Sequence, residues 1–141
     1  MNRDIKFRGK TQYTTPNVWV CGSLISYKNG DYQIVLDDEP KNGEPDKYFV
    51  IPETVGQFVG LCDGKEIYEG DVVLRGGVYL SEVKYIKSLT GFGLVKNGKI
   101  ESDENIIFYF IPSGVEVIGN IHDNPELLTK NKIYSNGKSK Y

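Results

Sequence analysis

Three carboxylates around a predicted turn, Glu66, Glu69 and Asp71, are the side chains with the clearest capacity for chemistry. Carboxylate oxygens are ligands that Mg²⁺ and Ca²⁺ prefer, so a cluster of this kind could hold a cation. Their spacing matches no Ca²⁺-binding loop, and strand alternation directs Glu66 away from the other two. Asp71 also has a sufficient structural task, because an aspartate at a turn accepts hydrogen bonds from nearby backbone amides. We therefore expect no metal site here.

General acid–base chemistry has one histidine to use, His122. A zinc site built on paired histidines is thereby excluded, and His122 stands beside a predicted helix start, where a capping or surface role is common. Ser23 and Ser113 lack the pattern of a nucleophile elbow, and no cysteine shares a motif with His122. The glycine-rich segments match neither a phosphate loop nor a dinucleotide fingerprint. We expect no catalytic residue, no cofactor and a non-enzymatic protein.

Aromatic residues are the other candidates. Phe108 and Phe110 could stack on bases, but alternation places them on one strand face, which indicates a core or a subunit contact more simply. Together with Phe7 and Trp19 they are the candidate interface residues. Nucleic-acid binding stays open as the alternative function, through the basic N-terminal strand and the lysine-rich tail.

The composition limits the classes of protein. With 17 Lys and Arg against 19 Asp and Glu, the formal net charge is −2 and the pI is near 5.5, so a polyanion would need a local basic patch. Cys21 and Cys62 are far apart without metal-ligand spacing, and no N-terminal apolar run indicates a signal peptide. We expect a protein of the bacterial host cytoplasm, with reduced thiols and no membrane-spanning segment.

The elements that must position these residues are predicted to be strands, since 10 Tyr, 6 Phe and 16 Gly favour strands and turns. Residues 1–62 are predicted to form a sheet of hairpins, in which Ile5 and Phe7 occupy one face of the first strand and Lys6 and Arg8 the other. The Asn29-Gly30 pair is typical of a type I′ hairpin turn. Five short strands over residues 63–121 are typical of an SH3-like barrel.

The region 122–141 is predicted to contain one short helix and a basic tail. Asp123 or Asn124 caps a helix whose first position is Pro125, and the helix ends near Thr129. Upstream, Asp63-Gly64 favours a tight turn, and Glu69-Gly70-Asp71 leads into the β-branched strand after it. The residues expected to hold the fold at these turns are Gly60, Asp63, Gly64, Tyr68, Glu69, Gly70, Asp71, Gly119, Asn120, Asn124 and Pro125.

Several segments resemble the YopX family of phage and prophage proteins. They are residues 4–9, 19–24, 57–61, 69–73 and 117–128 (Asp-Ile-Lys-Phe-Arg-Gly, Trp-Val-Cys-Gly-Ser-Leu, Gln-Phe-Val-Gly-Leu, Glu-Gly-Asp-Val-Val and Val-Ile-Gly-Asn-Ile-His-Asp-Asn-Pro-Glu-Leu-Leu). The chain departs from the family by placing Gly64 directly after Asp63, where relatives often carry a longer loop, and by His122, where an aromatic residue is usual. The resemblance implies an all-β phage protein that takes part in a higher-order symmetric assembly, and it names no activity.

Together the residues and the resemblance lead to one functional expectation. We expect a non-enzymatic interaction module that forms a homo-oligomer of more than two subunits and binds a host or phage protein. The N-terminal strand region is expected to contribute to the subunit interface, because exposed aromatics and unpaired strand edges favour association.

Overall fold

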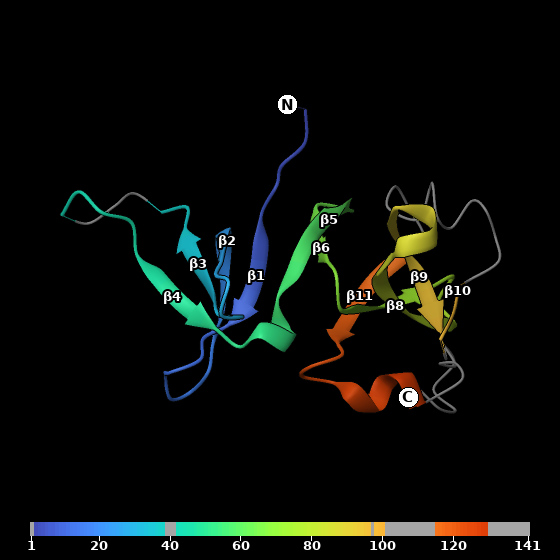
Figure 1. The fold of residues 1–141 in the computed structure, drawn as a ribbon. Helices are drawn as coiled ribbons and strands as arrows, with labels where there is room; N and C mark the ends of the chain where they lie inside the picture. Colours follow the sequence, from blue (N-terminus) through green and yellow to red (C-terminus); the bar gives the residue numbers. More distant parts are fainter. Residues whose placement is uncertain (1, 39–41, 97, 101–114, 130–141) are drawn as a thin grey trace. The chain divides into compact units, whose positions relative to one another are not determined.

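The computed structural model describes residues 2–38, 42–96, 98–100 and 115–129. The chain is all-β, and its strands form two antiparallel sheets with the orders β4-β3-β2-β1-β5-β6 and β10-β9-β8-β7-β11 (Figure 1). It divides into two compact units, Met1–Phe58 and Val59–Tyr141. None of the helical turns among the described residues has the length and apolar character that crossing a membrane requires.

The N-terminal unit is built from hairpins, as predicted. Its elements are β1 (Phe7–Lys10), β2 (Trp19–Ser26), β3 (Tyr32–Leu36), β4 (Lys47–Val50), the 3₁₀ turn η1 (Pro52–Thr54) and the beginning of β5 (Gly56–Cys62). The predicted hairpin around Asn29-Gly30 is confirmed, since β2 pairs with β3 and the Tyr27 N–H donates to the Asp31 carbonyl over 2.9 Å. The turn is not type I′, which needs positive φ at both central residues, because only Gly30 of the pair has it, at 94°.

The first strand of this unit also reaches the fourth. Thr11 bridges to Val50, the Gln12 N–H donates to the Phe49 carbonyl over 2.9 Å, and the Ile51 N–H donates to the Lys10 carbonyl over 2.8 Å. The sheet therefore curls around Ile34 and Val50, both fully buried.

Gly22 is required where β2 and β3 approach closely. At this position φ is 157°, and a Cβ would lie 1.9 Å from the Val35 carbonyl oxygen, so only glycine fits. Gly22 is the residue at which β2 passes from one neighbour to the other, since it pairs with Phe7 of β1 and with Leu36 of β3. In the pairing of β11 with β7 the register shifts between Val117 and Gly119, as at a β-bulge.

The five-stranded sheet of the C-terminal unit repeats the strand order of the first unit, with β11 beside β7. In the N-terminal unit the order is β5-β1-β2-β3-β4, and here it is β11-β7-β8-β9-β10. Its elements are β6 (Lys65–Tyr68), β7 (Asp71–Arg75), β8 (Tyr79–Ile86), η2 (Lys87–Leu89), β9 (Gly91–Lys96), β10 (Lys99–Ile100), β11 (Val115–Asn120) and η3 (Pro125–Thr129).

Two apolar clusters fill this unit. One contains Cys62, Ile67, Val73, Val83, Leu94 and Val115. The other contains Val72, Leu80 and Leu127. Because Val72 and Val73 are adjacent in a strand, their side chains leave opposite faces of β7 and enter different clusters. The β-branched run after Asp71 is thus buried on both sides.

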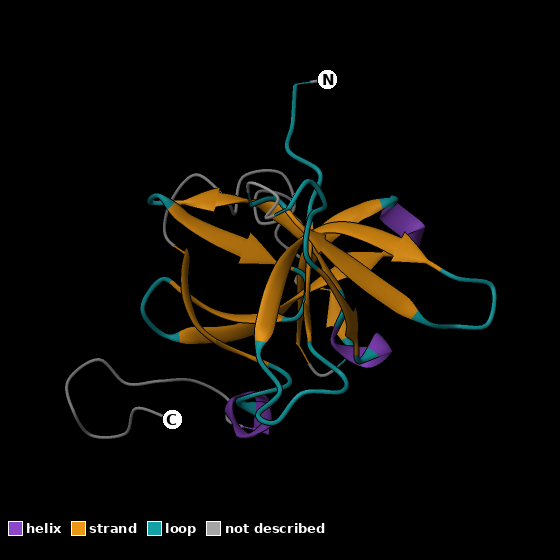
Figure 2. Ribbon diagram, turned by 90° about the vertical axis from the view of Figure 1, so that its left-hand side faces the viewer, coloured by secondary structure: helices purple, strands orange, loops and turns teal. Residues whose placement is uncertain are grey.

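Two parts of the predicted fold need correction. The SH3-like barrel expected over residues 63–121 is not confirmed, because the sheet formed by the described residues is open, with β10 and β11 at its edges. The strand expected to carry Phe108 and Phe110 lies outside the described residues. The predicted C-terminal helix, one of the helical segments drawn in purple in Figure 2, is a 3₁₀ turn, η3. Its Leu127 N–H donates to the Asn124 carbonyl three residues back. Five residues are too few to stabilise an α-helix, and burial of Leu127 holds the turn instead.

Candidate functional site

The predicted turn residues are organised around Asp71. Its carboxylate is 2% exposed, and Oδ2 accepts a hydrogen bond from the Tyr68 backbone N–H over 2.8 Å. Gly70, between them in the turn, has a φ of 93°, and its N–H donates to the Val83 carbonyl over 2.8 Å. At the preceding turn Asp63 and Gly64 have φ of 50° and 77°, the pair of positive angles that a type I′ hairpin needs. Gly60 lies half-buried in β5.

The structure brings the C-terminal motif to this turn. Asn120 pairs with Asp71, and the Ile121 N–H donates to the Gly70 carbonyl over 2.9 Å. A Cβ on Gly119 would lie 2.5 Å from Oδ1 of Asn124, and this same oxygen accepts from the Asn120 N–H over 3.3 Å. Pro125 begins η3 directly afterwards. We define the structural clasp as Tyr68, Gly70, Asp71, Gly119, Asn120 and Asn124. These residues contact one another and so join β6, β7 and β11.

The carboxylates near this clasp are unequal in exposure. Glu66 is exposed and accepts from the Tyr68 hydroxyl over 2.9 Å, Glu69 is half-buried, and Asp71 is buried. Within the described part of the chain, no three His, Cys, Asp or Glu side chains gather as metal ligands would. Asp71 is thus engaged by the backbone of Tyr68, and Glu66 by the hydroxyl of the same residue.

Glu82, on β8, was not among the residues predicted from the sequence. Burial raises the pKa of its carboxyl above the ordinary value of 4.5; the charge of Lys84 lowers it, and the nearby Glu69 raises it. Only the pairing of β8 between β7 and β9 reveals this environment.

His122, Cys62 and Cys21 lie in three different environments. The His122 N–H donates to Oδ1 of Asn120 over 2.9 Å, so this residue belongs to the loop before η3. Cys62 is buried in the core, and its Sγ donates to the Val115 carbonyl over 3.0 Å. Cys21 is exposed on β2.

Three exposed rings of the N-terminal unit form an aromatic cluster, defined as Tyr13, Tyr27 and Phe49. Their exposed fractions are 77%, 42% and 37%. The centroids of the Tyr13 and Phe49 rings are 6.0 Å apart in an edge-to-face arrangement, and those of Tyr27 and Phe49 are 6.4 Å apart. Rings at these distances attract one another. The cluster is thus ordered while much of its surface stays in solvent.

The backbone holds the cluster in place. The loop with Tyr13 is closed by Thr11, whose N–H donates to the Val18 carbonyl and whose carbonyl accepts from Nδ2 of Asn17. On the other side, the Tyr27 hydroxyl donates to Oε1 of Gln33 over 2.5 Å, and Gln33 pairs with Phe49 across β3 and β4. Three segments far apart in sequence therefore present their rings together.

Another part of the sheet face that carries Phe49 combines cations with rings. We define the cation–aromatic stripe as Lys6, Arg8, Lys10, Trp19 and Phe58. Lys6 Nζ lies 4.8 Å from the Phe58 ring centroid, while Arg8 Cζ and Lys10 Nζ lie 4.7 and 5.5 Å from that of Trp19. These distances are within the range of cation–π attraction.

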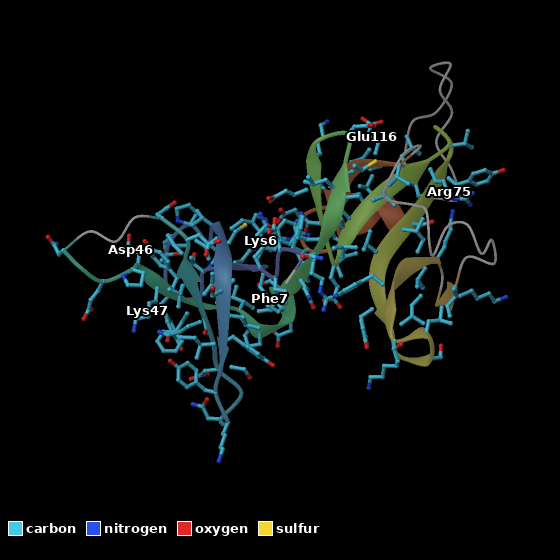
Figure 3. All side chains as sticks on the ribbon, turned by 90° about the horizontal axis from the view of Figure 1, so that it is seen from above. Lys6, Phe7, Asp46, Lys47, Arg75 and Glu116 are labelled. Atoms are coloured by element: carbon cyan, nitrogen blue, oxygen red, sulfur yellow. The ribbon has the colours of Figure 1, made fainter. Side chains whose placement is uncertain are left out.

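The candidate interface residues divide between two faces of the sheet. Arg8 pairs with Cys21 and Lys10 with Trp19, so these side chains share one face. Phe7, the strand neighbour of Arg8, takes the opposite face, as the alternation predicts; Figure 3 labels Lys6 and Phe7 at the start of β1. Phe108 and Phe110 lie outside the described residues. The alternation of Lys6 and Arg8 in the sequence predicted their shared face, but it did not include Lys10, and the roles of Tyr27 and Phe58 had no local signal.

The family model described as YopX protein matches residues 6–129. No curated protein matches the chain. The matched range includes the clasp, the aromatic cluster and the cation–aromatic stripe.

Proposed function

Because the chain belongs to the YopX family, we propose that it is a phage- or prophage-encoded, non-enzymatic interaction module of the bacterial cytoplasm. It assembles as a homo-oligomer of more than two subunits and binds a host or phage protein. The aromatic cluster is its contact surface.

The observation that supports this proposal is the exposure of the aromatic cluster. Tyr13, Tyr27 and Phe49 are ordered by ring contacts and hydrogen bonds, yet 37% to 77% of each side chain is in solvent. Aromatic rings are enriched in the cores of protein interfaces, where they bury a large area for a small loss of side-chain entropy. A contiguous group of such rings on a surface marks an interaction site.

A cluster of exposed rings on one part of the unit suits the proposed assembly. A ring of more than two copies uses heterologous contacts, in which one surface of each copy meets a different surface of the next. The aromatic cluster supplies one of these surfaces. Repeating the module in a ring also multiplies weak contacts with a partner through avidity.

Size-exclusion chromatography with light scattering tests the assembly. The wild-type chain should give a mass of at least three times its 15.9 kDa across the micromolar range. The double variant Tyr13→Ser/Phe49→Ser should shift the protein toward monomer. The matched control is Tyr48→Ser, since Tyr48 is adjacent to Phe49, equally exposed at 37%, and on the other face of β4.

Two results would count against this proposal. A wild-type mass near 15.9 kDa, that of one chain, would show that the protein is a monomer. An oligomer that dissociates equally in the double variant and in Tyr48→Ser removes the aromatic cluster as its contact surface. Recovery of a host or phage protein on the immobilised wild-type chain after nuclease treatment, and its loss with Tyr13→Ser/Phe49→Ser, tests the partner.

A further inference from the structure

Among the described strand residues of the N-terminal sheet, those whose register puts them on one face include cations and no acids. The register places on it the strand residues Arg8, Lys10, Trp19, Cys21, Ser23, Ile25, Gln33, Val35, Lys47, Phe49 and Gly56. Three of them are cations and none is acidic. Lys6 extends the row at the start of β1, where its carbonyl accepts from the Phe58 N–H over 2.8 Å. The local charge of this face thus opposes the net charge of the whole chain, −2.

The cations of the stripe follow a regular spacing. Residues that alternate along one strand face recur about every 6.7 Å, so Lys6, Arg8 and Lys10 present charge in a straight row. Strands β2 and β5 flank β1 on either side, and they contribute Trp19 and Phe58. A row of cations bordered by rings suits a ligand that carries a row of anions and flat apolar groups.

From this arrangement we propose that the cation–aromatic stripe binds single-stranded nucleic acid. Lys6, Arg8 and Lys10 contact successive phosphates, and bases stack on Trp19 and Phe58. Both rings are partly exposed, and the Arg8 guanidinium is itself a plane on which a base can stack. The contacts of the cations with the rings can be exchanged for charge-assisted hydrogen bonds to phosphate.

The rings favour a single strand over the other polyanions. A duplex keeps its bases stacked inside, so Trp19 and Phe58 would gain nothing from it. An acidic protein segment matches the cations but has no bases to stack on the rings. The contribution of Trp19 and Phe58 to binding therefore distinguishes a single strand from a duplex and from an acidic protein segment.

Intrinsic fluorescence provides a direct test, since Trp19 is the only tryptophan of the chain. Titration with oligothymidylate and oligouridylate of about 20 nucleotides, longer than the about 4–16 that one small barrel covers, should quench this fluorescence saturably. Polyglutamate of equal charge and a duplex of equal length should quench it much less. Equal quenching by polyglutamate would assign the stripe to acidic proteins and overturn the proposal, as would an absence of saturable quenching by either oligonucleotide.

Anisotropy of labelled oligothymidylate tests the cations. For three phosphate contacts the logarithm of the association constant should fall with the logarithm of salt concentration with a slope of about −2. Lys6→Gln/Arg8→Gln/Lys10→Gln should weaken binding at least tenfold and bring the slope near zero. Lys28→Gln/Lys84→Gln/Lys99→Gln removes the same charge from exposed lysines elsewhere and should leave the slope unchanged. Equal losses in both triple variants would reject the stripe.

Paired substitutions of Trp19 test the stacking without a change of charge. Trp19→Phe keeps a ring and should retain most of the affinity, whereas Trp19→Leu should weaken oligothymidylate binding several-fold at unchanged salt slope. Circular dichroism of both variants confirms the fold. If Trp19→Leu cannot be folded, the quenching of the wild-type chain still decides whether bases reach the ring. Equal affinities of folded Trp19→Leu and wild type would overturn the role of stacking.

Discussion

The buried carboxylate of Asp71 accepts a hydrogen bond from the backbone N–H of Tyr68 over 2.8 Å, across the turn between β6 and β7. The same turn receives the Ile121 N–H at the Gly70 carbonyl. Asp71 therefore stabilises the turn at which β7 begins, beside the end of β11.

Asp71→Ala should lower the free energy of unfolding by about 1–3 kcal/mol, because the Tyr68 N–H loses its acceptor in a buried place. Asp71→Asn keeps an acceptor oxygen of the same shape and should cost less. Urea unfolding followed by circular dichroism measures both. If Asp71→Asn lowers the free energy of unfolding as much as Asp71→Ala does, the turn depends on the negative charge and not on the hydrogen bond.

Gly70→Val should destabilise the fold by about 1–3 kcal/mol, since a β-branched residue is strained in left-handed backbone. The φ of Gly70 is 93°. The control is Gly91→Val at the start of β9, where φ is not positive and a Cβ meets only the Leu89 carbonyl oxygen, at 3.8 Å. The two melting temperatures should differ clearly, and equal values would contradict the argument from φ.

Gly119→Ala should cost about 1–3 kcal/mol of stability by overpacking, because its methyl group displaces Asn124. The Cβ would stand 2.5 Å from Asn124 Oδ1 and 3.0 Å from Leu127 Cδ1. A double-mutant cycle with Asn124→Ala isolates the first of these contacts. The cost of Gly119→Ala should shrink when Asn124 is already truncated; an undiminished cost would assign the clash to Leu127.

Glu82 should make stability depend on pH. Its folded pKa is raised above 4.5 by burial, so the folded protein retains this proton at a higher pH than the unfolded chain does. The protonated Glu82 carboxyl therefore contributes stability that is complete below the pKa of Glu82 in the unfolded chain. This stability is lost as the pH rises through the pKa of Glu82 in the folded protein. Glu82→Gln should therefore match the wild type near about pH 4 and melt at a higher temperature near about pH 7.

The control for this measurement is Glu116→Gln, which neutralises an exposed carboxylate on β11. The difference in melting temperature between Glu116→Gln and the wild type should be the same at the two pH values. Glu69→Gln should reduce the advantage of Glu82→Gln, since the charge of Glu69 contributes to the raised pKa of Glu82. A constant difference between Glu82→Gln and wild type at all pH values would refute the prediction.

Divalent cations should leave the melting temperature unchanged at about millimolar concentration, because a ligand raises it only by binding the native state. The three carboxylates Glu66, Glu69 and Asp71 differ in exposure, and Asp71 is engaged by the Tyr68 N–H. Thermal scans with Mg²⁺ and Ca²⁺ measure the effect. A saturable upward shift that Glu69→Gln abolishes would restore a metal-dependent enzyme as an explanation.

Local chemistry of the chain determined the turns and the faces of the strands. Asp63-Gly64 and Gly70 adopt the positive φ that their residue types favour, and Phe7 and Arg8 alternate as a strand requires. These properties depend on neighbours within a few residues, so a sequence carries them directly. The same holds for the hairpin around Asn29-Gly30, although the type of turn was wrong, because a longer loop relieves Asn29 of positive φ.

Long-range pairing decided which side chains meet. The cluster of Tyr13, Tyr27 and Phe49 depends on the register of β3 with β4 and on the bridge from Thr11 to Val50. The environment of Glu82 depends on the strands on either side of it, and the 3₁₀ form of η3 depends on where Leu127 is buried. Alternation assigns a residue to a face but not to a neighbour, because the neighbour is chosen by the free energy of packing the whole sheet.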